Sequence, residues 1–286
     1  MAAPLTLDAL NALRRDGFVA ALGAIVEHAP WVAEAAFTAR PFSTVAAVHE
    51  AMTAALQQAA PERQLAVIRA HPELGSKVAR AELTAASQAE QGSLGLDRLS
   101  EEEFARFSRL NATYRARFGF PFIVCVRRHT RDSILRQFER RLSNDAAAER
   151  TAALAEIALI ARLRLNAALD GPGKPPTDGR LTTHVIDLAA GRPAAGVRLA
   201  LYEVGSSARG RLRDAVTNAD GRTDAPLMAG EPLRIGSYEL QFEIGNYFGG
   251  GFFDTAPVRF SIAEPEAHYH VPLLATPWSY TTYRGS

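Results

Sequence analysis

Two histidines stand one residue apart in the segment HYHVPLL near the end of the chain, at His268 and His270. In a β-strand, residues i and i+2 project from the same face, so the two imidazoles are expected side by side. Histidine titrates near neutral pH and can act as an acid or a base without a cofactor. A zinc site would need a third ligand at a suitable spacing, which the sequence does not offer. Solvent exposure of one ring and packing of the other is the simplest alternative.

A second group of chemically capable residues occurs in the first half of the chain. His71 precedes a proline in AVIRAHPELGSK, which favours an extended residue at the end of a helix. Further on, LTAASQAEQ places Ser87, Glu90 and Gln91 at helical positions i, i+3 and i+4, so a helix capped by Thr84 would present them on one face. Such a set could orient a substrate and move a proton. A helix terminus and a solvated polar stripe are the simpler interpretations.

The first half of the chain, which contains His71, Ser87, Glu90 and Gln91, has helical periodicity. Apolar residues recur at helical spacing from residue 6 to about residue 168. Ser100 and Glu103 form a capping-box pattern at the start of one helix. The segment AAAERTAALAEIALIARLRLNAAL predicts one long closing helix with Leu154, Ile157, Ile160 and Leu163 or Leu165 on its packed side. The sequence therefore predicts an all-helical domain over residues 1–170.

The second half of the chain has a different period. GPGKPPTDGR, residues 171–180, contains three prolines and three glycines and predicts a linker. Beyond it, apolar residues alternate in short runs such as LTTHVID, VRLALYEV, SYELQFEI and VRFSIA, separated by turn residues. This pattern predicts an antiparallel β-sandwich over residues 181–286. The expected fold class is multidomain, α then β.

Composition narrows the class of protein. The chain has 32 Lys and Arg against 31 Asp and Glu, so we expect no bulk attraction to nucleic acid or to an anionic membrane. The single cysteine, Cys125, excludes an intrachain disulfide, and its apolar surroundings favour a buried thiol. We identify no signal peptide and no apolar run of the ~20 residues that span a bilayer. A cytoplasmic location is expected.

The second half resembles a known family. LTTHVIDLAAGRPAAGV with His184, TNADGRTDAPL with Arg222, HYHVPLL and the terminal YRGS occur in the order seen in transthyretin-like proteins, and more closely in their enzymatic branch, the 5-hydroxyisourate hydrolases. The resemblance covers residues 181–286. It implies a homotetramer whose site lies at a subunit interface. It also implies catalytic roles for His184, Arg222 and His270 and substrate binding by Tyr283, Arg284 and Ser286. Which histidine is the base stays open, and His268 is expected to be structural.

The first half resembles another family. HPELGSK, LTAASQAEQ and FGFPFIVCV, in that order, are similar to the 2-oxo-4-hydroxy-4-carboxy-5-ureidoimidazoline (OHCU) decarboxylases, over about residues 7–168. The resemblance implies an all-helical fold with its site between helices, and catalytic roles for His71 and Glu90. The neighbouring Arg162 remains an alternative to Arg164 as the substrate-binding arginine. The substrate-binding residues implied in this half are Pro72, Ser87, Gln88, Ala89, Gln91, Phe122, Ile123, Val124, Cys125, Val126 and Arg164.

Together the two resemblances imply one bifunctional enzyme, similar to the bifunctional allantoin synthases. The second half would hydrolyse 5-hydroxyisourate, and the first half would decarboxylate the product to (S)-allantoin, with no metal or other cofactor. One alternative is a small-ligand binding protein with a helical scaffold, and another is a metal-binding interaction module. Two histidines in one cleft favour the enzyme, because a passive carrier has no need of them.

Overall fold

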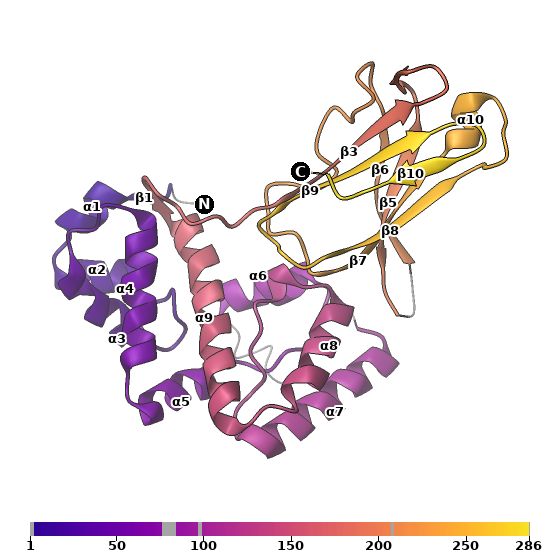
Figure 1. Ribbon diagram of the computed structural model, residues 1–286. Helices are drawn as coiled ribbons and strands as arrows, with labels where there is room; N and C mark the ends of the chain where they lie inside the picture. Colours follow the sequence, from indigo (N-terminus) through magenta and orange to yellow (C-terminus); the bar gives the residue numbers. More distant parts are fainter. Residues whose placement is uncertain (1–2, 76–83, 97–98, 207–208, 286) are drawn as a thin grey trace. The chain divides into compact units, whose positions relative to one another are not determined.

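The structure is a computed structural model that describes residues 3–75, 84–96, 99–206 and 209–285. The chain divides into two compact units, one comprising Met1–Arg127 and Ile134–Pro176 and the other comprising Arg128–Ser133 and Thr177–Ser286. The first unit is helical and the second is built from two β-sheets (Figure 1). The predicted fold class is confirmed.

The helical unit is built from short helices followed by longer ones. Among the described residues, 3-10 turns at Phe37–Ala39 and Val126–Arg128 interrupt the α-helices. The α-helices of this half are α1 (Leu7–Ala12), α2 (Arg15–Leu22), α3 (Pro30–Ala36), α4 (Val45–Gln58), α5 (Pro61–Ala70), α6 (Ala85–Ser93), α7 (Glu101–Phe118), α8 (Arg131–Arg141) and α9 (Ala146–Ala168).

Side-chain caps fix where the helices begin. Ser100 and Glu103 form the predicted capping box at the start of α7, in which each side chain bonds the other residue's backbone N–H. Thr84 caps α6 as predicted, because its hydroxyl accepts a hydrogen bond from the backbone N–H of Ser87 at 3.2 Å. Helix α7 ends at Gly119, which adopts the left-handed conformation with φ of 73°.

The long helix α9 packs against α4 and α5 in the helical unit (Figure 1). Leu154, Ile157, Leu163 and Leu165 are buried, and Ile160 is partly buried against the same core. The predicted packed side of the closing helix is therefore confirmed. Helix α9 is important for function because its last turns carry Arg164.

The two ends of the helical unit meet in a short parallel pair of strands. β1 (Leu5–Thr6) pairs with β2 (Leu169–Asp170), which directly follows α9. The next residues continue along the same unit, because the carbonyls of Pro172 and Gly173 accept hydrogen bonds from the start of α4, each at 3.0 Å. The beginning of the Pro/Gly segment is thus bonded to the helices.

Two four-stranded sheets form the second unit, with strand orders β10-β9-β3-β4 and β6-β5-β7-β8. All pairs are antiparallel except β3 with β9, which is parallel. Strand β6 was not among the predicted strands because its residues do not alternate in polarity. The strands are β3 (Arg180–Asp187), β4 (Arg192–Pro193), β5 (Arg198–Val204), β6 (Arg209–Val216), β7 (Gly236–Phe242), β8 (Ala256–Ile262), β9 (His268–Ala275) and β10 (Tyr280–Thr282), with a short helix α10 (Ile244–Phe248) before β8.

A six-residue segment from the first half of the chain belongs to the sandwich unit. The backbone of Ile235 donates to the Arg128 carbonyl at 2.8 Å and accepts from the Thr130 N–H at 3.1 Å. Arg128 also forms an ion pair with Glu266 at 2.8 Å. The structural division of the chain is therefore not contiguous in sequence.

Candidate active sites

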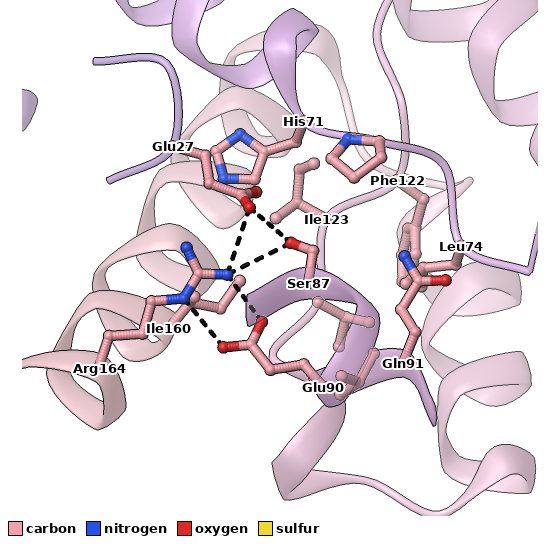
Figure 2. Close-up of a pocket in the computed structure, with 13 residues that line it drawn as sticks. Glu27, His71, Leu74, Ser87, Glu90, Gln91, Phe122, Ile123, Ile160 and Arg164 are labelled. Atoms are coloured by element: carbon pink, nitrogen blue, oxygen red, sulfur yellow. Dashed lines mark hydrogen bonds and ion pairs between the residues drawn. The ribbon is translucent and has the colours of Figure 1, made fainter. Parts of the chain in front are cut away.

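A pocket lies within the helical unit, where α5, α6, α9 and the segment after α7 come together (Figure 2). The space within it, about 370 Å³, includes solvent at its open side. The residues that line it are Glu27, His71, Pro72, Leu74, Ser87, Glu90, Gln91, Phe122, Ile123, Val124, Val126, Ile160 and Arg164.

His71 reaches the pocket because α5 ends at this residue. The following proline disfavours a helical conformation, and His71 is extended, with φ of -76° and ψ of 140°. Its ring Nδ1 donates a hydrogen bond to the Val67 carbonyl at 2.9 Å, which leaves Nε2 as the nitrogen with the free lone pair. Burial lowers the pKa of His71 below its ordinary value, although the Val67 carbonyl and Glu27 oppose this effect. His71 is therefore a neutral base at neutral pH.

One face of α6 meets Arg164 from α9. Arg164 donates from Nε at 2.9 Å and from Nη2 at 2.8 Å to the two carboxylate oxygens of Glu90, in a bidentate ion pair. Its Nη2 also donates to the Ser87 hydroxyl at 3.3 Å. Figure 2 shows this network beside His71. The predicted face of α6 is thus assembled around a guanidinium, the group best suited to bind a substrate carboxylate.

Glu27 is a member of this network that the sequence did not indicate. The residue is only 4% exposed, and its Oε1 accepts hydrogen bonds from the hydroxyls of Thr84 and Ser87. Arg164 Nη2 lies 3.7 Å from the same oxygen. Burial alone would raise the pKa of Glu27, but the two hydroxyls and Arg164 together hold it below its ordinary value, so Glu27 is ionised. No sequence signal marks it, because it lies far from His71 and Glu90 in the chain.

A second group of polar residues lies on one face of the sandwich. In β3, Leu181, Thr183 and Val185 are buried, whereas Thr182 and His184 are on the opposite, partly exposed face. In the neighbouring strand β9, His268 and His270 are likewise partly exposed and alternate with buried residues. Because Thr182 is in register with His270, the polar residues of the two strands are adjacent.

A tight turn brings Arg222 to His184. Gly221 has φ of 71°, and a Cβ at this position would collide with the Val185 carbonyl oxygen, so only glycine fits. The Gly221 carbonyl accepts from the Val185 N–H at 2.8 Å, and a β-bridge joins His184 to Arg222. Burial, followed by the charge of Arg222, lowers the pKa of His184.

The last described residue, Gly285, packs directly on His270. Its N–H donates to the His270 carbonyl at 2.9 Å, and a Cβ at position 285 would lie 2.5 Å from the imidazole Cδ2. Any side chain there would therefore displace the ring. Burial, then Arg222, His268 and His184, lowers the pKa of His270. The three histidines and Arg222 thus form one electrostatic cluster.

Comparisons with known proteins assign both units. The model of the OHCU decarboxylase family matches residues 11–166, and that of the HIUase/Transthyretin family matches residues 181–285. The chain belongs to both families. The family resemblances predicted from the sequence are confirmed.

Individual relatives agree with this assignment. The 2-oxo-4-hydroxy-4-carboxy-5-ureidoimidazoline decarboxylase of Haloferax volcanii is 48% identical over 161 residues, which cover 56% of this chain and 94% of the relative. The 5-hydroxyisourate hydrolase of Mesorhizobium japonicum is 53% identical over 116 residues, which cover 38% of this chain and 93% of the relative. A crystal structure of (S)-allantoin synthase is 33% identical, covers 99% of this chain and 100% of its own, and superposes with a TM-score of 0.54. These relatives support the prediction that the chain is an enzyme.

In the OHCU decarboxylase domain, most of the residues predicted to bind substrate line the pocket. Gln88 and Ala89 are exposed on another side of α6, and Cys125 is buried outside the lining. Arg164 lines the pocket and Arg162 does not. Leu74 and Ile160 also line the pocket. The sequence did not indicate them as site residues, because they follow the apolar pattern of core residues.

In the HIUase/Transthyretin domain, the structure brings together only part of the predicted set. Tyr283 is 57% exposed, and the described residues make no hydrogen bond or ring contact with its side chain. Arg284 lies over the ring of Tyr269 at 4.9 Å and within 3.8 Å of Glu264. Ser286 lies outside the described residues.

Within residues 3–75, 84–96, 99–206 and 209–285, no group of three or more His, Cys, Asp and Glu side chains is placed to hold a metal ion. In the same ranges, none of the helices has the length and apolar character that crossing a membrane requires.

Proposed function

We propose that this chain hydrolyses 5-hydroxyisourate in its second unit and decarboxylates the product, OHCU, to (S)-allantoin in its helical unit. The observation that supports this most strongly is the pocket of the helical unit, where a neutral His71 faces the Arg164–Glu90 pair within a domain of the OHCU decarboxylase family. The single cysteine and the near-neutral net charge support a cytoplasmic location for this chemistry.

The pocket supplies what a cofactor-free decarboxylation requires. The substrate's own conjugated imine and ureido groups take up the electron pair that carbon dioxide leaves behind. The protein must hold the carboxylate and exchange protons with one face of the substrate. Arg164 is the cation available for the substrate carboxylate, and His71 Nε2 is the proton acceptor. Glu90 forms an ion pair with Arg164. A proton returned to one face only would set the handedness of the product.

Replacing Glu27 by glutamine tests whether the buried carboxylate positions the pocket. The Ser87 hydroxyl donates to Glu27 at 2.7 Å, and Arg164 lies beside both, so the loss of the charge loosens Arg164. We expect the decarboxylation rate to fall about 10- to 100-fold, the usual effect of a hydrogen bond to a charged group. The measurement is the rate of (S)-allantoin formation by circular dichroism. Glu34→Gln, which removes an exposed partner of Arg15, is the control. Equal rates of decarboxylation for the two variants would show that Glu27 does not position the pocket.

The cluster on the sandwich suits amide hydrolysis. Water attack on the cyclic amide needs a base to take its proton and a cation or donor to stabilise the oxyanion that develops. His184 and His270 are the candidate bases, and Arg222 is the cation placed next to both. Tyr283 and Arg284 remain proposed substrate contacts.

The hydrolysis rate should depend on pH in one direction only. The pKa values of His184 and His270 both lie below the ordinary histidine value of about 6.5, so both rings are neutral at about pH 7. We expect kcat/KM of the first step to stay level from about pH 8 down to about pH 6.5 and to fall at lower pH, as the base becomes protonated. Stopped-flow measurement of substrate absorbance across this range checks it. A midpoint above the ordinary histidine pKa would show that neither depressed histidine is the base.

The second unit is proposed to assemble as a homotetramer. The polar cluster occupies a sheet face on which Thr182, His184, His268 and His270 are all partly exposed, as expected of a surface that a second subunit covers. Phe252 is 74% exposed and Trp278 is 72% exposed, which is unusual for large apolar side chains that stay in water. Light scattering is expected to give a multiple of the 30.9 kDa chain mass. A monomeric mass with full hydrolase activity would exclude a site shared between subunits.

The first experiment is an assay of both steps together. 5-Hydroxyisourate is generated from urate with urate oxidase, the protein is added, and ultraviolet absorbance and circular dichroism are recorded. We expect faster loss of the substrate band, followed by a growing signal of (S)-allantoin. If the protein holds the ligand without turnover, as a binding protein would, the substrate will decay no faster than in buffer.

A further inference from the structure

Thr182 lies between the two histidines of β9 on the polar face of the sheet. Its Oγ1 is 2.8 Å from His268 Nε2 and 2.8 Å from His270 Nδ1. A hydroxyl carries a single proton, so Thr182 donates to one of the two rings and accepts from the other. The direction of this chain of hydrogen bonds therefore decides which nitrogen of each ring carries a proton.

Arg180 sets that direction. Its Nη2 lies 3.4 Å from His268 Nδ1, and because a guanidinium can only donate, Nδ1 must accept. A neutral His268 then carries its proton on Nε2 and donates it to Thr182, whose own proton points to His270 Nδ1. The other acceptor near Thr182, the Tyr269 carbonyl, is 3.5 Å away, at the limit of a hydrogen bond.

The neutral state of both rings follows from their surroundings. Burial and the charge of Arg180 lower the pKa of His268. Burial, Arg222 and the two other histidines lower the pKa of His270. With Nδ1 occupied as an acceptor, a neutral His270 must carry its proton on Nε2 and can only donate from that nitrogen.

His184 has the opposite arrangement. Its Nε2 is buried and has no hydrogen-bond partner among the described residues, and its ring forms a hydrogen bond with the backbone of Asp220. This bond must come from Nδ1, which donates, so Nε2 carries a free lone pair. The two histidines next to Arg222 are therefore in different tautomers.

We propose that Thr182 fixes His270 as an Nε2–H hydrogen-bond donor, so that His184 is the base of the hydrolysis. The inference rests on the proposed hydrolase function. The water oxygen bonds to the carbonyl carbon while its proton passes to His184 Nε2. The carbon–nitrogen bond then breaks, and the ring nitrogen that leaves takes this proton from His184. His270 stays neutral throughout and donates a hydrogen bond to the carbonyl oxygen as negative charge develops there. Thr182 and His268 are positioning residues.

Nitrogen NMR of the full chain, labelled with ¹⁵N-histidine, tests the tautomers directly. We expect His270 to carry its proton on Nε2 and His184 to carry its proton on Nδ1, at a pH where both are neutral. A proton on His270 Nδ1, or on His184 Nε2, overturns the assignment. Because this readout needs no substrate, it tests the tautomers separately from the hydrolase function, and a failure of one is distinguishable from a failure of the other.

Kinetics of matched threonine variants test the positioning role. Thr182→Val removes the hydroxyl at nearly constant volume, and we expect kcat of hydrolysis to fall about tenfold, as for loss of one hydrogen bond, with KM unchanged. Thr182→Ser restores the hydroxyl and should recover the rate. The control is Thr183→Val, which removes a hydroxyl from the buried face of the same strand, where it donates to the Val271 carbonyl at 2.7 Å. Equal rates for the two valine variants, or no recovery in Thr182→Ser, would contradict the proposal.

Discussion

Replacing His71 by alanine is expected to slow decarboxylation about 10²- to 10⁴-fold, the contribution of a well-placed general acid or base. His71 is the neutral base of the pocket, and because its Nδ1 is committed to the Val67 carbonyl, Nε2 is the nitrogen left to accept a proton. In the coupled assay, loss of the 5-hydroxyisourate band should proceed at the normal rate. The (S)-allantoin signal should then grow only at the rate of the uncatalysed reaction.

His49 provides a matched control for His71. It lies in the same unit, is also partly buried, and its Nε2 donates to the Ala158 carbonyl at 2.9 Å, but it does not line the pocket. His49→Gln should leave the formation of (S)-allantoin within about twofold of normal, as expected for a position outside the catalytic network. A loss as large as that of His71→Ala would mean that the effect comes from the fold of the unit and not from acid–base chemistry.

Replacing Glu149 by glutamine is expected to destabilise the helical unit by about 3–5 kcal/mol, the cost of leaving one charge of a buried ion pair without its partner. Arg141 and Glu149 are 2% and 0% exposed, and Arg141 Nε donates to the carboxylate at 2.8 Å. Arg141 also donates to the Ile123 carbonyl at 2.6 Å, so the same change loosens a wall of the pocket. Urea unfolding followed by helical circular dichroism measures the effect.

An exposed ion pair supplies the control for Glu149. Glu139 binds Arg106 at 2.9 Å, and the two side chains are about half exposed, so Glu139→Gln should cost no more than about 1 kcal/mol. The hydrolysis step, which belongs to the other unit, should keep its rate in both variants. If both variants unfold at the same urea concentration, the buried Arg141–Glu149 pair contributes no more to the free energy of unfolding than the exposed Arg106–Glu139 pair.

The sequence predicted those parts of the molecule that depend on local pattern. Ser100, Thr84 and the alternation of LTTHVID act within a few residues, so the caps and the strand could be inferred from spacing alone. Strand β6 (Arg209–Val216) was not predicted from the sequence because it lies at a sheet edge. Its residues are almost all exposed, so they need no apolar face and show no alternation of polarity.

The candidate sites could be predicted only where local motifs supply their residues. The pocket brings together Glu27, His71, Ser87 and Arg164, which are far apart in the chain. Only those that lie in recognisable sequence motifs could be predicted as site residues. A buried carboxylate such as Glu27 acquires its role from partners that packing brings together. The contacts of Thr182 with His268 and His270 could not be predicted for the same reason, because the parallel register of β3 and β9 is a tertiary property.

The pairing of β1 with β2 has a consequence for how such chains arise. Since residues 5–6 lie beside residues 169–170, the two ends of the helical unit adjoin, and the chain departs from this unit in between only over Arg128–Ser133. A module whose ends adjoin can be inserted before or after another coding segment, or circularly permuted, without rerouting its backbone. Gene fusion in either order is therefore structurally permissible for the helical unit, and the order of the two domains along the chain need not follow the order of the two reactions.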